Sequence, residues 1–397
     1  MYTVDWPAVA NAGLAAAAAE GNLPGQAAAH LSLGLLDWCI GRYPQAIEQY
    51  NTALALARRA PWVEAEAAVL GNLGATYWTV GDLHGSAEHH TKALAINRRI
   101  GRPIGEATNL TTLGVVYATL GRLDLATEHL VEALAIGRRL GSYNGGALAN
   151  LGEVYYQLGR LDDALETLTE ALTLHRRLGD RHAEAVTVRA LAALHCDAGR
   201  YAGAADLADA ALTISRDTGA RRAEAHAMII AATVHSHLDQ IERAIEYHRR
   251  AVDIGRVIGS RYAEASGQIG LAGALRRAGR LDEATDHVKS ALTTAREAGY
   301  LVIEGNATTA WAAVRLAQGF PGSAGELAER AIAIHAETGY RIGQAHAHLV
   351  AEQAFRQRGD EAVAVGHHDR ALALFAEVGV PVAGHARALL GQAAPAN

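Results

Sequence analysis

Histidine is the residue type that first suggests chemistry in this sequence, because the chain has 19 of them. Imidazole is the commonest protein metal ligand and the usual proton carrier near neutral pH. On a helix, two ligands reach one metal ion when they lie three or four residues apart. The paired histidines here are adjacent or two residues apart: His89-His90, His235/His237, His346/His348 and His367-His368. The spacing predicts no metal site, and we expect most histidines at solvent-facing positions or where other units have Tyr.

Acidic and thiol groups give no stronger signal for catalysis. Glu153 and Asp197 are the two carboxylates that an acid–base mechanism could use, but no deep pocket is implied around them. No Gly-x-x-x-x-Gly-Lys-Ser/Thr phosphate loop occurs. Cys39 and Cys196 are the only cysteines, which excludes a disulfide framework and fits a reducing cytosol. We therefore expect a protein that is not an enzyme and that has no cofactor.

Charged residues recur in two series that both fit helix ends. Arginine pairs stand where helices are expected to finish, a position that the helix dipole favours for positive charge: Arg58-Arg59, Arg98-Arg99, Arg138-Arg139 and Arg176-Arg177. Glutamates stand where helices are expected to begin: Glu66, Glu106, Glu184, Glu224, Glu264 and Glu304. With a net charge of −6, these patterns predict no direct nucleic-acid binding.

Targeting signals are also lacking in the sequence. The first residues contain Asp5 and no basic segment, unlike a signal peptide. Apolar residues nowhere run for the roughly 18 positions that a membrane helix needs. We expect a cytoplasmic protein without a membrane partner.

The elements that position these residues are internal repeats. Glycine opens a turn at intervals of about 40 residues: Gly41, Gly81, Gly121, Gly159, Gly199, Gly279, Gly319 and Gly359. Asp239 stands where this series lacks its glycine. A second series interleaves with the first: Gly21, Pro61, Gly101, Gly141, Gly179, Gly219, Gly259, Gly299, Gly339 and Gly379. Each unit therefore has two helices and two tight turns, and nine units fit.

Alanine recurs at two positions inside every unit and predicts where helices touch. One series follows the turn by five residues, with Ser86 as its exception: Ala46, Ala126, Ala164, Ala204, Ala244, Ala284, Ala324 and Ala364. The other follows seven residues later: Ala53, Ala93, Ala133, Ala171, Ala211, Ala251, Ala291, Ala331 and Ala371. Small side chains at fixed positions let two helices approach closely.

Leu113-Gly114, Tyr117, Gly121, Ala126 and Ala133 resemble the tetratricopeptide (TPR) signature, and so do Leu73-Gly74 and Leu151-Gly152 with their neighbours. The unit is 40 residues long, whereas the common repeat has about 34. The resemblance implies an all-α fold, a right-handed α-solenoid of about nine TPR helix pairs. We expect a capping or truncated half-repeat at 1–24, the array at 25–379, and a short C-terminal capping helix with a tail at 380–397.

The ending and the long units further resemble the C-terminal TPR arrays of actinobacterial SARP-type/NB-ARC transcriptional regulators. Gly101-Arg-Pro-Ile-Gly-Glu-Ala and Ala133-Leu-Ala-Ile-Gly-Arg-Arg-Leu-Gly carry this likeness. It implies a sensor or regulatory array whose partner is a protein, a peptide or its own upstream domains. Two alternatives stay open: a free-standing peptide receptor or adaptor, and an oligomerising scaffold. The sequence leaves the oligomeric state open.

The TPR resemblance implies that the first helix of each unit lines a concave groove. The early units place apolar residues there: Leu31, Leu35, Trp38 and Trp78. The middle units place polar ones: Glu153, Tyr156, Arg189, Asp197, His226, His237, Arg276 and Arg277. One interpretation is a solvated surface with internally paired charges. The other is a partner site in which the tryptophans anchor apolar groups and the arginines meet carboxylates.

Overall fold

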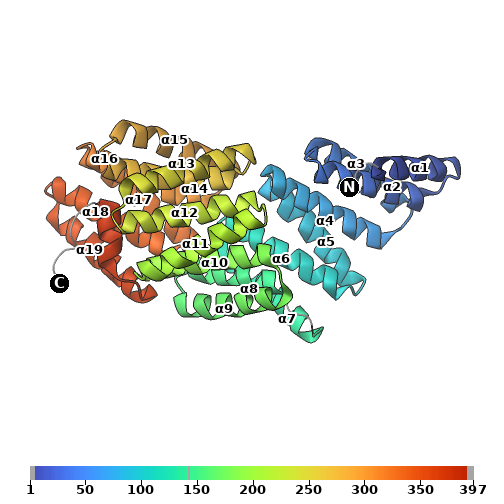
Figure 1. Cartoon of the computed structure of the whole chain (residues 1–397), viewed down its shortest axis with the longest axis horizontal. Coiled ribbons are helices and arrows are strands. Elements are labelled where there is room, and N and C mark those ends of the chain that lie inside the picture. The colour runs from blue at the N-terminus through green and yellow to red at the C-terminus, as the bar shows by residue number, and fades with distance from the viewer. Residues whose placement is uncertain (1–4, 142–143, 391–397) are drawn as a thin grey trace. The chain divides into compact units, whose positions relative to one another are not determined.

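The computed structural model describes residues 5–141 and 144–390, and this part of the chain folds into twenty helices without a β-strand (Figure 1). They are α1 (Trp6–Ala19), α2 (Leu23–Cys39), α3 (Tyr43–Arg59), α4 (Val63–Val80), α5 (Leu83–Arg99), α6 (Pro103–Thr119), α7 (Leu123–Arg139), α8 (Gly145–Gln157), α9 (Leu161–Leu178), α10 (Arg181–Asp197), α11 (Tyr201–Asp217), α12 (Arg221–His237), α13 (Ile241–Val257), α14 (Arg261–Arg277), α15 (Leu281–Ala298), α16 (Leu301–Ala317), α17 (Pro321–Thr338), α18 (Arg341–Gln357), α19 (Glu361–Val378) and α20 (Val382–Leu390).

Helices α2 to α19 form nine consecutive pairs, which confirms the predicted solenoid of TPR helix pairs. We call the even-numbered first helix of each pair an A helix and the odd-numbered second one a B helix. Helix α1 packs on α2 at the front of the array, and α20 follows the ninth pair.

The turns have the backbone that the glycine series predicts. Every glycine of both series has a positive φ, between +64° and +88°. Asp239, where the series lacks glycine, also has a positive φ of +62°. A residue with a Cβ resists this left-handed conformation, and Asp resists it less than most. The unit with the altered turn therefore keeps the geometry of the others.

Contact between helices depends on the small residues of each unit. All members of the two alanine series, together with Ser86, are fully buried. A glycine in the first four A helices instead receives a large side chain from the B helix of the same unit. The pairs are Gly34 with Tyr50, Gly74 with His90, Gly114 with Leu130, and Gly152 with Leu168.

Consecutive units are joined by an ion pair between the two charged series. An arginine in the last turn of a B helix bonds a glutamate in the first turn of the next A helix, eight residues on. The pairs are Arg58–Glu66, Arg98–Glu106, Arg176–Glu184, Arg216–Glu224, Arg256–Glu264 and Arg296–Glu304, with N–O distances of 2.8 to 3.0 Å. The arginine and glutamate recurrences are thus two halves of one contact.

The histidines lie elsewhere than the sequence predicts. Only His84 and His182 are exposed, so the expected solvent-facing placement is wrong. Four buried imidazoles each lie against a glycine of a neighbouring A helix, whose missing side chain leaves room for a flat ring: His90 on Gly74, His175 on Gly145, His248 on Gly270, and His335 on Gly305. These four histidines are therefore packing residues at helix interfaces.

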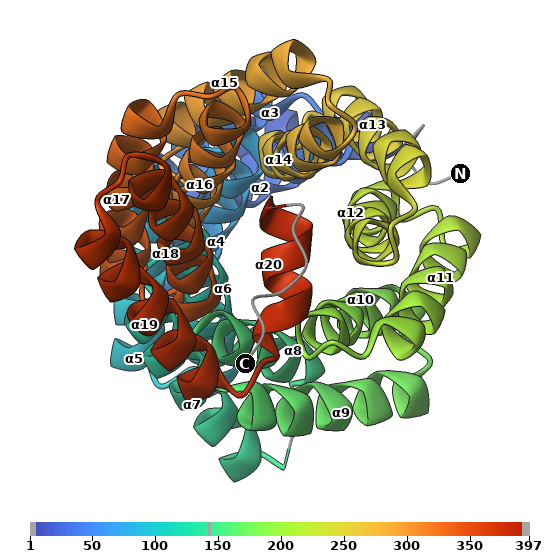
Figure 2. The same ribbon diagram turned by 90° about the vertical axis from the view of Figure 1, so that its left-hand side faces the viewer.

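The array divides into two compact units. Unit 1 comprises Met1–Tyr117 and Glu128–Tyr143, and unit 2 comprises Ala118–Thr127 and Asn144–Asn397. In unit 2 the helices curve into a ring with the A helices inside and the B helices outside (Figure 2). Tyr156 and Leu161 of the fourth repeat pack against the apolar cluster of the ninth repeat, around Ile342, Phe375 and Val378. The last repeat of unit 2 therefore returns to the start of its own ring.

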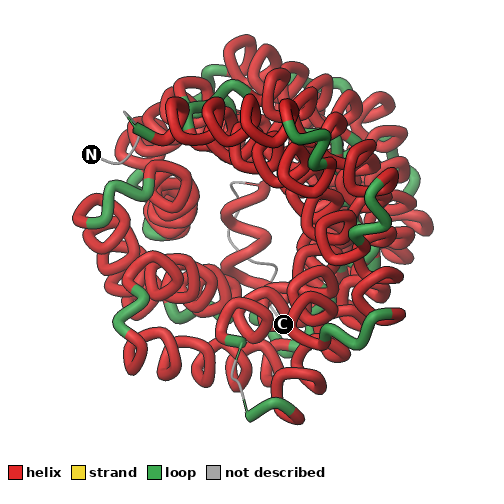
Figure 3. Tube along the Cα trace, turned by 90° about the vertical axis from the view of Figure 1, so that its right-hand side faces the viewer, coloured by secondary structure: helices red, strands yellow, loops and turns green. Residues whose placement is uncertain are grey.

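Helix α20 lies inside this ring, and the view from the opposite side shows the same arrangement (Figure 3). It contacts α18 of the last repeat and also α12 across the ring. Its Leu389 and Leu390 pack against the apolar clusters of the last repeats. Besides covering the end of the array, α20 thus reaches helices far back in the sequence.

Candidate functional site

A row of charged and aromatic side chains crosses the inner face of unit 2. Glu153 on α8 pairs with Arg189 on α10. Arg189 lies beside His226 on α12, whose ring centroid is 6.0 Å from that of Tyr262 on α14. Tyr262 in turn meets Tyr300 edge-on at 5.4 Å. We call these five residues the polar row.

Burial sets the protonation of the polar row. It lowers the pKa of Arg189 to about 10. It also lowers the pKa of His226 to about 3, with the positive charges of Arg189 and Arg222 adding to the effect. The pKa of Tyr262 is raised by burial. At neutral pH the row thus presents an ion pair, a neutral imidazole and two phenols.

The polar row drifts in register from helix to helix. Glu153 lies six residues before its turn glycine, Arg189 ten before Gly199, and His226 thirteen before Asp239. Each step is three or four residues, about one helical turn or 5.4 Å. Because the stacked helices are tilted, a straight line drawn across them meets each following A helix three or four residues nearer to its start. Three predicted groove residues, Glu153, Arg189 and His226, therefore meet although their positions within the 40-residue repeat differ.

A second group lies around the ends of α8, α10 and α12 and the start of α18. The Tyr156 hydroxyl donates to Asp197 Oδ2 at 2.6 Å, and a side-chain hydrogen bond links Tyr156 with Tyr340. Burial raises the pKa of both Tyr156 and Asp197. His237 stacks on Tyr201 at a centroid distance of 4.8 Å. Burial lowers its pKa to about 4, with nearby His385 and Arg277 adding to the effect.

His385 of α20 is central to this second group. Its Nε2 lies 2.9 Å from the backbone oxygen of Asp197, and its Nδ1 lies 2.9 Å from Nε2 of His346. A carbonyl only accepts, so Nε2 of His385 carries a proton, and a hydrogen bond joins its Nδ1 to Nε2 of His346. The ring also stacks on Phe375 at 5.1 Å and is 2% exposed. We call Tyr156, Asp197, Tyr201, His237, Tyr340, His346 and His385 the turn-end cluster.

Arg276 and Arg277 close α14 beside this group. Arg277 donates to the backbone oxygen of Ser236, and its Nη2 lies 2.7 Å from Asp239 Oδ1. Burial, helped by the charge of Arg277, lowers the pKa of Arg276 to about 10. Arg277 thus joins the seventh repeat to the turn of the sixth repeat, where the turn glycine is missing.

The four apolar candidates belong to unit 1. Leu31, Leu35 and Trp38 lie on α2, and Trp78 lies on α4. Leu31 packs against the core around Tyr50 and Leu73. Leu35 and Trp38 are 39% and 37% exposed, and Trp78 is half-buried. The other eight predicted residues lie in unit 2, so the set is divided between the two compact units.

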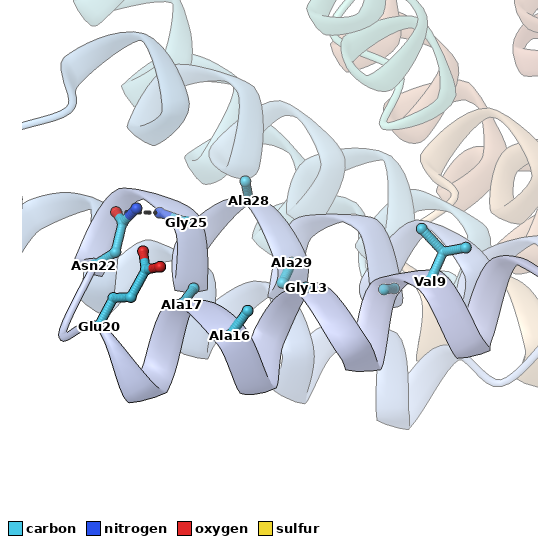
Figure 4. Close-up of a pocket in the computed structure, with 10 residues that line it drawn as sticks. Val9, Gly13, Ala16, Ala17, Glu20, Asn22, Gly25, Ala28 and Ala29 are labelled. Atoms are coloured by element: carbon cyan, nitrogen blue, oxygen red, sulfur yellow. Dashed lines mark hydrogen bonds between the residues drawn. The ribbon is translucent and has the colours of Figure 1, made fainter.

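A shallow groove also runs between α1 and α2 of unit 1 (Figure 4). Its volume is about 470 Å³, and small residues such as Gly13, Ala16, Ala17 and Ala28 line most of it. The one acidic group on its wall is Glu20. These residues offer neither a nucleophile nor a set of ligands.

No group of three or more His, Cys, Asp or Glu side chains in residues 5–141 and 144–390 is arranged to hold a metal ion. Within the same ranges, no helix combines the length and apolarity that crossing a membrane requires.

Comparison with known proteins defines the repeats. A tetratricopeptide repeat family model matches residues 65–139 and 145–217. The chain carries tetratricopeptide repeats. No curated protein matches its sequence significantly.

Among solved structures, a Rap protein complexed with competence and sporulation factor is similar over 89% of this TPR chain and 99% of its own, with 12% identity and a TM-score of 0.68. The Rap conjugation gene regulator of plasmid pLS20, in complex with a Phr peptide, matches 80% of this chain and 96% of its own, with 14% identity and a TM-score of 0.61. A signal transduction ATPase with a TPR sensor from Pyrococcus horikoshii matches 85% of this chain and 53% of its own, with 13% identity and a TM-score of 0.49. At these identities the likeness concerns the fold.

Several residues of the two groups escaped the sequence analysis. Tyr262, Tyr300 and Tyr340 lie at or near the start of A helices, where the repeat pattern gives no inner-face position. His346 and His385 were visible only as members of a histidine-rich composition. A histidine among the small and apolar residues at the start of α20 was the one available signal, since a buried imidazole needs partners.

Proposed function

We propose that this TPR protein is a non-catalytic module that binds a peptide or a protein segment on the inner face of unit 2. The observation that carries the proposal is the polar row, in which half-buried or buried charged and aromatic groups from four consecutive A helices and the N-cap of a fifth converge. In a solenoid each repeat contacts its neighbours, and the curvature leaves a concave surface that such proteins use for binding. Charges and phenols gathered on an inner face are the groups that fix the orientation of a bound segment.

Two comparisons support the binding of a peptide or protein segment. The Rap protein and the pLS20 regulator share the fold over most of their length, and each was solved in complex with a factor or peptide. Within unit 2, α20 already shows that the inner face accepts a helical segment. The proposal therefore rests on the inner surface together with the shared fold.

The test is selection of random short peptides by display on the full chain, followed by anisotropy titration of the selected sequences. Arg189→Gln removes the charge that pairs with Glu153, and we expect it to weaken binding by about tenfold or more. Lys289→Ala, an exposed change on α15, is the matched control and leaves binding unchanged. Selected peptides that bind both variants as tightly as wild type would place the site elsewhere.

The finer assignments belong to this proposal too. The likeness to SARP-type regulators favours a sensor array of a bacterial transcriptional regulator, acting in the cytoplasm on a partner or on its own upstream domains. The division into a half-repeat at 1–24, an array at 25–379 and a cap with tail at 380–397 is part of the same proposal. A free-standing peptide receptor or adaptor is the alternative, favoured by tight binding of a short peptide without further domains. A molecular mass in solution that increases with protein concentration would favour an oligomerising scaffold.

A further inference from the structure

Helix α20 is held inside the ring of unit 2 by contacts to repeats that precede it by more than a hundred residues. We propose that α20 is a built-in ligand, which occupies part of the inner face and is displaced when an external segment of matching chemistry binds. The inference rests on the proposed function, since it names the chemistry of the segment that the inner face accepts.

The contacts of α20 are those of a recognised segment rather than of a simple cover. His385 donates to the backbone oxygen of Asp197, at the end of α10, and is hydrogen-bonded to His346. The last carbonyls of a helix lack intrahelical partners, so the Asp197 oxygen is a natural acceptor for an incoming donor. Gly384 passes so close to the Tyr201 hydroxyl that a Cβ at this position would overlap it. A Cβ at Gly199 would likewise lie only 2.9 Å from Cγ of Pro381, the residue before α20.

These contacts define what an external partner must resemble. A glycine or another very small residue has to pass Tyr201, and the next residue has to donate to Asp197 and form a hydrogen bond with His346. Four or five residues further along, two apolar side chains take the places of Leu389 and Leu390 in the clusters of the last repeats. The preferred partner is thus a short, helical, small-residue segment with one histidine and an apolar end.

The attachment of α20 is suited to exchange. The helix has nine residues, and helices this short are marginal in water without tertiary contacts. Covalent attachment gives it an effective concentration in the millimolar range. An external peptide therefore binds only when its affinity or concentration outweighs the tethered competitor.

The experiment measures binding of a fluorescein-labelled synthetic peptide of residues 380–390 to the full chain by anisotropy. In the variant Gly384→Leu/His385→Ala the tethered helix loses its hydrogen bonds and overlaps Tyr201. We expect this variant to bind the peptide at least about tenfold more tightly than wild type, because apparent affinity scales with the unoccupied fraction. The single variant His385→Ala, a smaller change, should shift affinity in the same direction.

Two controls accompany the titration. Ala383→Ser alters an exposed position of α20 and should behave as wild type. A peptide that carries alanine in place of its histidine should bind the Gly384→Leu/His385→Ala variant at least about tenfold more weakly. Hydrogen exchange should show protection of residues 382–390 in wild type and its loss in that variant, with α8–α19 still protected.

Equal peptide affinity for wild type and both variants would overturn the inference, and so would absence of binding to any of them. Either result leaves the proposed function standing if displayed random peptides still bind through Arg189. If display selects nothing from wild type or variants while the 380–390 peptide binds the released chain, the inner face serves only its own helix. In that case the proposed function fails and the docking of α20 stands.

Discussion

At the scale of single residues, burial sets the protonation of histidines both on the inner face and between packed helices. It holds His226, His237 and His248 neutral by lowering their pKa values to about 3, 4 and 3. Each of these imidazoles titrates near its ordinary pKa of about 6.5 once the chain unfolds. The native state therefore excludes protons that the unfolded chain takes up.

His248 offers the cleanest test of this effect, because it is 1% exposed and its lowered pKa has burial as its only cause. The unfolded chain binds a proton below about pH 6.5 and the native chain only below about pH 3, so stability falls as the pH falls between these values. His248→Leu should reduce the loss of unfolding free energy between pH 7 and pH 5 by about 1–2 kcal/mol.

Urea unfolding at the two pH values measures the difference. His84→Ala, at an exposed position, is the control and should keep the acid sensitivity of wild type. If His248→Leu loses as much stability on acidification as the control does, the imidazole is already protonated in the native state and the packing argument is wrong.

The hydroxyl of Tyr156 supports a buried carboxylate. It donates to Asp197 Oδ2 at 2.6 Å, where burial raises the carboxyl pKa. Tyr156→Phe removes the donor and leaves the acceptor in place, so we expect a loss of about 1–3 kcal/mol in unfolding free energy. In an Asp197→Asn background the same change should cost less. Additive losses in the double variant would show that the two groups do not interact in solution.

At the scale of helices, the sequence predicted most of what the structure contains. The glycine series predicted the turns, and the alanine series predicted the buried contact points, because both depend on local backbone geometry or on a fixed place in the unit. The pairing of Gly34 with Tyr50 and of Gly74 with His90 was not predicted. It joins positions 16 residues apart on different helices, and only the relative rotation of the two helices makes them meet.

Gly152 and Leu168 test this pairing. A Cβ at residue 152 would lie 2.6 Å from Leu168 Cγ, so Gly152→Ala should destabilise by about 1–3 kcal/mol despite the better helix propensity of alanine. Leu168→Ala should cost about 2–5 kcal/mol by leaving a cavity. In the double variant the two changes compensate, and the total should fall short of the sum by about 1–2 kcal/mol.

Gly273 on α14 is the matched control for this cycle. Nothing lies within 4 Å of its Cβ position, so Gly273→Ala should stabilise by roughly 1 kcal/mol through helix propensity alone. Thermal or urea unfolding of wild type and of the four variants measures these differences in stability. Stabilisation by Gly152→Ala equal to that by Gly273→Ala would mean that Leu168 does not fill the space over the glycine.

At the scale of the molecule, the repeat count was predictable and the closure of unit 2 was not. Periodicity gives each repeat its neighbours along the chain, but the small rotation from one repeat to the next decides which distant repeats meet. The candidate site shows the same limit. The sequence placed Glu153, Arg189 and His226 on inner positions, whereas the meeting of Asp197 with His385 depends on how far the ring curves.

Closure of unit 2 predicts a difference between two turn glycines with the same backbone. Gly159 and Gly279 both have φ +77°. A Cβ at residue 279 meets nothing within 4 Å, whereas one at residue 159 would overlap Val378 Cγ1 of the last repeat. Alanine at either position costs about 1–2 kcal/mol for the left-handed backbone. Gly159→Ala carries the added cost of displacing the ninth repeat, so we expect it to lower the unfolding free energy by about 1–3 kcal/mol more.

Hydrogen exchange separates this closure effect from general destabilisation. In Gly159→Ala, α19 and α20 should lose protection before α9 and α11, since the clash strikes the contact between the first and last repeats of unit 2. Gly279→Ala should weaken protection around its own turn and leave α20 protected. If both variants lose the same stability and α20 stays protected in each, the fourth and ninth repeats are apart in solution. An open array of that kind would expose the inner face to partners without requiring α20 to leave.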